Sequence, residues 1–132
     1  MRGLLAGCIC LLGLWIAGSA YAHHSMAGFD RNKTVTIVGT VKQFKWANPH
    51  SWIEMEVPNG KGGMEIWNVE MTSPAVLIRA GWKSTSIKPG DKVSVDAHPL
   101  LSGDPGAIFV SVTLPGGQTL TDRPAQPAAP RP

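Results

Sequence analysis

The sequence predicts an all-β fold with one short helix, built as a single domain. Three observations support this prediction. Apolar and polar residues alternate in five separate segments, which is the pattern of strands with one buried face. A short segment with helical spacing separates the third of these segments from the fourth. The first segment is interrupted by a glycine, which is expected where a strand bends.

The first expected strand, residues 34–46, contains this glycine at Gly39. Residues 51–57 and 64–70 alternate in the same way, and the turn sequence PNGKGG joins them. Two alternating segments separated by a glycine-rich turn indicate a β-hairpin. The first strand is expected to bend at Gly39 because it must contribute to both sides of a small barrel.

The spacing changes at Ser73 and Pro74, an N-cap residue followed by a first-turn proline. Residues 75–81 supply about two helical turns, and alternation resumes at 91–98 and 107–114. Three strands, a helix and two strands follow one another in the OB-fold, a five-stranded Greek-key barrel. The sequence therefore predicts an OB-fold-like barrel, with another small β-barrel or a β-sandwich as the alternative.

The beginning of the chain has the layout of a secretory signal peptide. Met1 and Arg2 precede a short apolar run, and Ala-Tyr-Ala stands directly before His23. Because this run is shorter than the ~20 residues that span a membrane, we expect cleavage after Ala22 and a periplasmic or secreted protein without a membrane span. The expected organisation is a signal peptide at 1–22, a leader at 23–33, the barrel domain at 34–114 and a proline-rich disordered tail at 115–132.

Cleavage removes 22 of the 132 residues, including both cysteines, Cys8 and Cys10. The mature chain of 110 residues then has no disulfide, thiolate nucleophile or thiol metal ligand. Loss of Arg2 leaves 11 basic against 9 acidic residues, a net charge of +2 without runs of one sign. Such a weak, dispersed charge does not match a phosphate-binding surface, so we expect no nucleic-acid partner.

Most of the expected mature chain is covered by four stretches: HHSMAGFD, VGTVKQFKWANPHSWIEMEV, GWKSTSIKPGDKV and HPL. They resemble the domain-of-unknown-function 6152 family of small exported bacterial proteins, over residues 23–115. The HHS and NPHSW patterns are the most specific part of this resemblance. It implies export and a single domain but no established activity, so the function must be inferred from the residues.

Four histidines remain after cleavage: His23, His24, His50 and His98. In an OB-fold, the loop between strands 1 and 2 and the loop between strands 4 and 5 flank one binding cleft. His50 lies in the first loop and His98 at the start of the second, so we expect both at the same end of the barrel. The leader of 11 residues can extend at most ~36 Å, which is enough to bring His23 back along the first strand to this cleft.

A histidine at the mature amino terminus offers its α-amine and a ring nitrogen together. With a nitrogen from a second histidine, they form a T-shaped site that resembles the histidine brace of copper proteins. Nitrogen-rich, tetragonal sites favour Cu(II), whereas three histidines with a water molecule also suit zinc. We therefore predict copper as the cofactor, with zinc as the alternative. The expected ligands, in decreasing order, are His23, then His50 and His98, then His24, and last Met26.

Each histidine also has a purely structural interpretation, as a chain terminus, a loop residue or the end of a strand. Trp46 and Trp52 bracket the loop of His50, where their rings can stack on a flat ligand such as a sugar or else fill and shield the barrel. The sequence shows no nucleophile elbow, phosphate-binding loop, dinucleotide fingerprint or HExxH motif, so no residue is predicted to be catalytic. The acidic residues of the hairpin alternate on the side expected to face solvent, which indicates a role in solubility: Glu54, Glu56, Glu65 and Glu70.

These observations predict a periplasmic metal-binding protein that holds copper for binding or delivery, and delivery implies a periplasmic partner protein. The first alternative is a metal-free OB-type module that binds a polymer, a small ligand or a protein through the rim at Trp46 and Trp52. The second alternative is a copper-dependent redox enzyme. That activity requires an open coordination position and a substrate surface, and the sequence displays neither clearly.

Overall fold

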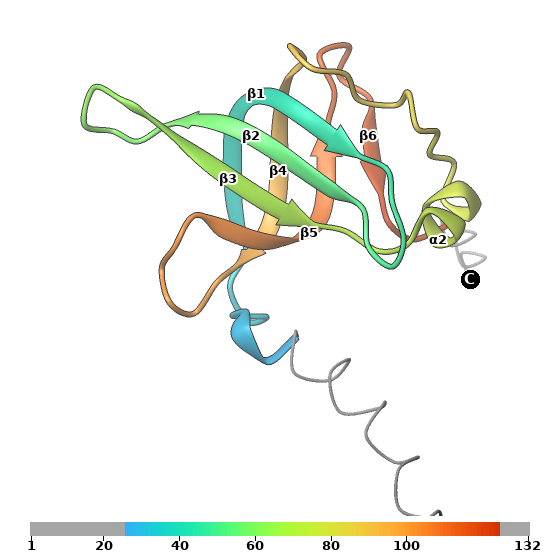
Figure 1. The fold of residues 1–132 in the computed structure, drawn as a ribbon, viewed down its shortest axis with the longest axis horizontal. Helices are drawn as coiled ribbons and strands as arrows, with labels where there is room; N and C mark the ends of the chain where they lie inside the picture. The colour runs from blue at the N-terminus through green and yellow to red at the C-terminus, as the bar shows by residue number, and fades with distance from the viewer. Residues whose placement is uncertain (1–25, 125–132) are drawn as a thin grey trace, which may run out of the picture.

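Five strands and one short helix follow one another in the predicted order in the computed structural model, which describes residues 26–124 (Figure 1). A short 3-10 helix precedes them and a sixth strand follows. The elements are η1 (Met26–Gly28), β1 (Val35–Lys45), β2 (Trp52–Pro58), β3 (Met64–Glu70), α2 (Pro74–Arg79), β4 (Lys92–Pro99), β5 (Gly106–Thr113) and β6 (Thr119–Thr121).

The sheet closes on itself through one parallel pairing. β1 pairs antiparallel with both β2 and β4, β2 pairs with β3, and β4 pairs with β5. The parallel pairing of β3 with β5 completes the ring, so that the strands around the barrel run β1-β2-β3-β5-β4. This is the OB-fold arrangement, with the helix between the third and fourth strands, and the predicted fold class is confirmed.

β1 contributes to two sides of the barrel, and its Gly39 is required by close packing. The first part of β1 pairs with β4 and the second part with β2, with a register shift between Val41 and Gln43. A Cβ atom at Gly39 would collide with the carbonyl oxygen of Glu56 and lie 2.9 Å from a methyl group of Val57. Gly39 therefore lets two strands approach where a larger residue would hold them apart.

The core consists of the inward-facing residues of the strands, together with side chains from the helix and the segment after it. Leu77 from α2 and Trp82 just beyond it are buried among them. Burial of this apolar surface is the main favourable contribution to folding. The buried apolar residues are Ile37, Val41, Ile53, Met55, Val69, Met71, Leu77, Trp82, Ile87, Val93, Val95, Ala97, Ala107, Phe109 and Val112.

The ordered domain extends beyond residue 114, where the sequence analysis places the start of a disordered tail. β6 pairs antiparallel with β5, and Trp82 Nε1 donates a hydrogen bond of 2.7 Å to the carbonyl oxygen of Thr121. Leu120 packs against the core. The turn before β6 contains Gly117, with a φ of 85° that favours glycine. The composition of this segment suggests a linker, but Gly117 lies in a tight turn and Leu120 anchors the strand to the core.

The described end of the leader lies along the loop between β4 and β5. Phe29 forms an isolated bridge with Leu100, and the amide of Asp30 donates a hydrogen bond of 2.8 Å to the carbonyl oxygen of Pro99. The amide of Leu101 donates in turn to the carbonyl oxygen of Gly28. The predicted ligands His23 and His24 lie outside the described residues, as does the expected signal peptide. Within residues 26–124, no helix has the length and apolar character needed to cross a membrane.

Candidate functional site

One row of outward-facing side chains crosses all five strands of the barrel. Residues that pair side by side on neighbouring strands face the same side of a sheet. Lys45 pairs with Trp52, which pairs on its other side with Glu70. Glu70 pairs with Ile108, and Ile108 pairs with His98. Since their sequence neighbours in β2 to β5 face the core, these five residues face outward, and we call them the outer row.

His50, in the loop before β2, is held by one member of the outer row. Its ring atom Nδ1 hydrogen-bonds to Oε1 of Glu70. The Glu70 side chain is only 13% exposed, whereas the His50 side chain is 41% exposed. A carboxylate only accepts, so His50 carries its proton on Nδ1. In the neutral ring this leaves the lone pair on Nε2 for another partner.

His98 has the same arrangement with a different acceptor. Its Nδ1 lies 2.8 Å from the backbone carbonyl oxygen of Lys33 in the leader. A carbonyl oxygen can only accept, so Nδ1 is the donor and Nε2 of the neutral ring has a lone pair. The leader therefore orients His98, and β3 orients His50. Both histidines present the same ring nitrogen for further chemistry.

His98 and Glu70, the partner of His50, lie on one wall of the barrel. Glu70 and His98 are separated in the outer row by Ile108, so their Cα atoms lie two strand spacings apart, about 10 Å. Among residues 26–124, no group of three His, Cys, Asp or Glu side chains is arranged to hold a metal ion.

The leader approaches this wall by a shorter route than the sequence analysis expects. Val35, the first residue of β1, pairs with Ala97, so the leader meets β1 directly beside His98 and need not run back along the barrel. Among the described leader residues, Gly28 is the most N-terminal one that hydrogen-bonds to the β4–β5 loop. Four residues lie between His23 and Gly28, and the five steps from one to the other span at most about 17 Å. Met26 lies in η1, between these two points.

The two tryptophans of the predicted rim have different surroundings. Trp46 packs against the core and makes an edge-to-face contact with Phe44, with 5.7 Å between the ring centroids. Trp52 lies in the outer row and is half-buried. The structure therefore places Trp52 on the outer wall and uses the ring of Trp46 to shield the core.

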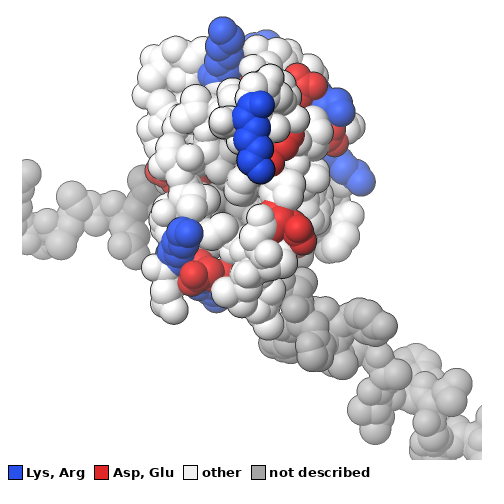
Figure 2. Space-filling model, turned by 90° about the vertical axis from the view of Figure 1, so that its left-hand side faces the viewer, with Lys and Arg blue, Asp and Glu red and all other residues white. Residues whose placement is uncertain are grey.

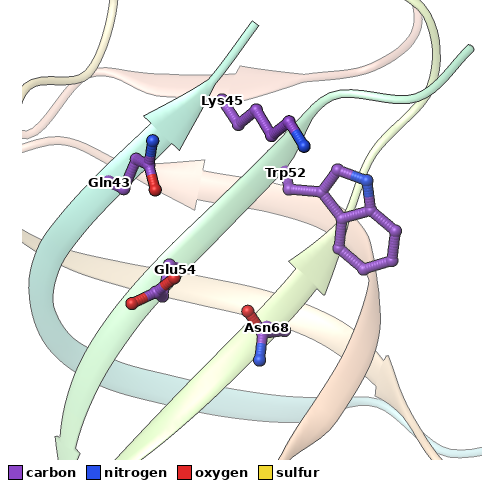
Figure 3. A pocket seen from close by; sticks show the side chains of 5 residues that line it. All are labelled: Gln43, Lys45, Trp52, Glu54 and Asn68. Atoms are coloured by element: carbon purple, nitrogen blue, oxygen red, sulfur yellow. The ribbon is translucent and has the colours of Figure 1, made fainter. Parts of the chain in front are cut away.

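A hollow of about 270 Å³ lies beside Trp52 on the outer surface of β1, β2 and β3 (Figure 3). Besides Trp52 and Lys45 of the outer row, it is lined by Gln43, Glu54 and Asn68, which pair side by side in the neighbouring row. Figure 3 shows these five side chains arranged around the hollow, with the ammonium group of Lys45 directed toward the ring of Trp52. The hollow thus combines one aromatic ring, two amides and one charge of each sign.

Charge around the barrel is mixed in sign. Glu54 forms an ion pair with Lys42, with 3.0 Å between Nζ and Oε1. Figure 2 shows a face on which basic and acidic side chains are interspersed among uncharged residues. The hollow therefore has no excess of positive charge that would attract a phosphate backbone.

The sequence analysis assigns Glu70 to the solvent-facing acids of the hairpin and misses its contact with His50. The signal that could have found it is the hairpin register, which pairs Trp52 with Glu70. Because His50 lies two residues before Trp52, this register places the Glu70 carboxylate on the facing strand close to His50. Gln43 and Asn68 cannot be identified from the sequence either, because exposed amides have no distinctive pattern.

Comparisons with known proteins identify a family and leave the function open. The model of a protein family of unknown function, DUF6152, matches residues 13–109. A comparison with curated protein sequences found no match.

Among solved structures, one crystal form of the mitochondrial single-stranded DNA-binding protein Rim1 of S. cerevisiae is similar, with a TM-score of 0.48 and 13% identity. The similarity covers 63% of this chain and 93% of that chain. A second crystal form of Rim1 has a TM-score of 0.46 and 11% identity, over 72% of this chain and 98% of that chain. DNA binding is a property of that protein, and at this identity the likeness concerns the fold alone.

Proposed function

This chain belongs to DUF6152, a family of unknown function, and we propose that it is an exported protein that binds copper through histidine nitrogens. One observation carries the proposal. His50 and His98 each donate the Nδ1 proton to an oxygen acceptor, Glu70 or the carbonyl of Lys33, and each keeps Nε2 for a metal.

This arrangement is the one that metal-binding histidines commonly have. A ligating histidine usually donates its second ring nitrogen to a carboxylate or a backbone carbonyl, which fixes the ring and makes the ligating nitrogen more basic. The ring then loses little freedom when the metal binds. The His50 side chain is 41% exposed, so water could satisfy its ring nitrogens. The fold by itself therefore does not require the hydrogen bond to Glu70.

The remaining ligands in this proposal come from the mature amino terminus. Cleavage after Ala22 would free the α-amine of His23, which with its ring nitrogen supplies two ligands. The leader meets the barrel beside His98, so His98 is the nearest partner for His23, and His50 lies further along the same wall. His24 and Met26 rank behind them as ligands. Nitrogen ligands of this kind favour Cu(II), with zinc as the runner-up.

A copper titration tests the proposal. The protein is purified from the periplasm, its start at His23 is checked by mass spectrometry, and Cu(II) is added while tryptophan emission and the EPR spectrum are recorded. We expect one equivalent to bind, with nitrogen hyperfine structure and quenched emission. One extra residue before His23 should abolish this spectrum, because it removes the α-amine from the chelate. If the extended and native proteins bind copper alike, the amino-terminal site is wrong.

Two matched variants test the contribution of His50. Glu70→Gln removes the carboxylate that holds His50, and we expect copper affinity to fall by about tenfold or more. Glu56→Gln makes the same change on an exposed residue of β2 and should leave affinity unchanged. Equal affinities for these two variants would contradict a role of Glu70 in orienting a copper ligand, and unchanged affinity in His50→Ala or His98→Ala would exclude that histidine as a ligand. A delivery function additionally requires transfer of the bound copper to a second periplasmic protein.

A further inference from the structure

We infer that the hollow beside Trp52 binds one neutral pyranose unit of a glycan chain, a site separate from the proposed copper ligands. Its walls come from three adjacent strands, with Gln43 from β1, Glu54 from β2 and Asn68 from β3 in register side by side. Such a surface is rigid, because residues next to its members in the chain, such as Ile53 and Val69, are fully buried in the core.

The aromatic ring supplies the first element of sugar recognition. Trp52 is half-buried at one side of the hollow, with its ring lying over the end of β3 (Figure 3). A large indole ring anchored in this way gives contact area with little loss of conformational freedom. The C–H face of a pyranose is apolar and slightly positive, and it suits the negative face of an indole ring.

The polar groups supply the second element. The amides of Gln43 and Asn68 can each donate and accept, the Glu54 carboxylate accepts, and the Lys45 ammonium donates. Neighbouring hydroxyl groups of a sugar likewise donate and accept, so they match a mixed set of this kind. Pockets that enclose drug-sized ligands have volumes of about 300–1,000 Å³. A hollow of about 270 Å³ therefore suits a single ring.

The charges argue against a nucleic acid as the occupant. Glu54 lines the hollow and already pairs with Lys42, and Glu70 lies beside Trp52 in the outer row. Among the five residues that line the hollow, Lys45 has the only basic side chain. Single-stranded nucleic acids need a positively charged groove along their backbone in addition to stacking rings. A neutral sugar needs no such groove.

Calorimetry and tryptophan emission test the inference. The mature protein, without added metal, is titrated with soluble hexamers of β-1,4-linked glucose and of β-1,4-linked N-acetylglucosamine, and separately with a twelve-nucleotide oligothymidylate. We expect one of the sugars to bind with a change in emission, and the oligonucleotide not to bind. Trp52→Ala should weaken sugar binding by about tenfold or more, because a stacked ring is lost. Absence of binding by both sugars, or binding of the oligonucleotide alone, would overturn the inference.

Two amide variants separate recognition from folding. Asn68→Ala removes an exposed side chain of the hollow and should weaken sugar binding by about fivefold. Gln118→Ala removes an exposed amide from the turn between β5 and β6 and should change nothing. Equal sugar affinities for these variants would place the sugar elsewhere. His98→Ala should leave sugar binding unchanged, because His98 does not line the hollow.

Discussion

The two faces of the β2–β3 hairpin share one backbone but have opposite surroundings. Ile53 and Val69 point inward and are fully buried. Their neighbours Trp52 and Glu70 point outward and form the centre of the outer row. Because side chains alternate along a strand, residues one position apart contribute to different properties of the molecule. The inward face is expected to determine stability, and the outward face to determine binding.

The largest expected effect comes from the inward face. Ile53→Ala removes buried methyl and methylene groups and leaves a cavity, which should lower the free energy of unfolding by about 3 kcal/mol. Chemical denaturation measures this change. Ile78→Ala makes the same substitution on α2, where Ile78 is 60% exposed, and should cost less than about 0.5 kcal/mol. Similar losses in both variants would contradict the assignment of Ile53 to the core.

A smaller effect is expected where an added methyl group meets the backbone. Gly39→Ala forces a Cβ against the carbonyl oxygen of Glu56 and should lower stability by about 2 kcal/mol. Gly106→Ala is the control, because its Cβ would meet a terminal methyl group of Leu100 at 2.6 Å, and that side chain can rotate away. Thermal unfolding should show the lower midpoint for Gly39→Ala. The opposite order would mean that β1 and β2 can separate at little cost.

The outward face should affect stability less. Glu70→Gln weakens the hydrogen bond to His50 and should lower the free energy of unfolding by about 1 kcal/mol or less. Glu56→Gln should leave it unchanged. Chemical denaturation again gives the difference, and NMR of the His50 ring would show whether its proton leaves Nδ1. A loss as large as that of Ile53→Ala would show that this pair supports folding rather than binding.

The smallest effect is expected at the hollow. Asn68→Ala changes an exposed side chain next to the buried Val69 and should alter the free energy of unfolding by less than about 0.5 kcal/mol. The same variant is expected to weaken sugar binding. Measuring unfolding and sugar affinity on one preparation tests whether the two faces are independent. A parallel loss of both would mean that they are coupled.

Much of the fold could be predicted because its determinants are local. The alternation in 51–57 and 64–70 predicts the hairpin, and Pro74 predicts the start of the helix. β6 was missed because three residues with one partly buried leucine do not form a pattern. The candidate site was harder to predict. The loop sequence indicates His50, but its partner Glu70 follows the same alternation as the solvent-facing acids of the hairpin.

The sequence by itself determines which residues of this protein form strands and which of their side chains face inward, because both depend on spacing within a few residues. Only the tertiary structure decides which outward residues become neighbours. The parallel pairing of β3 with β5 places Glu70 and His98 in one row, although 28 positions separate them. The pairing of β1 with β4 sets the leader beside His98. Both pairings join segments that are far apart in the chain, so no local spacing encodes them.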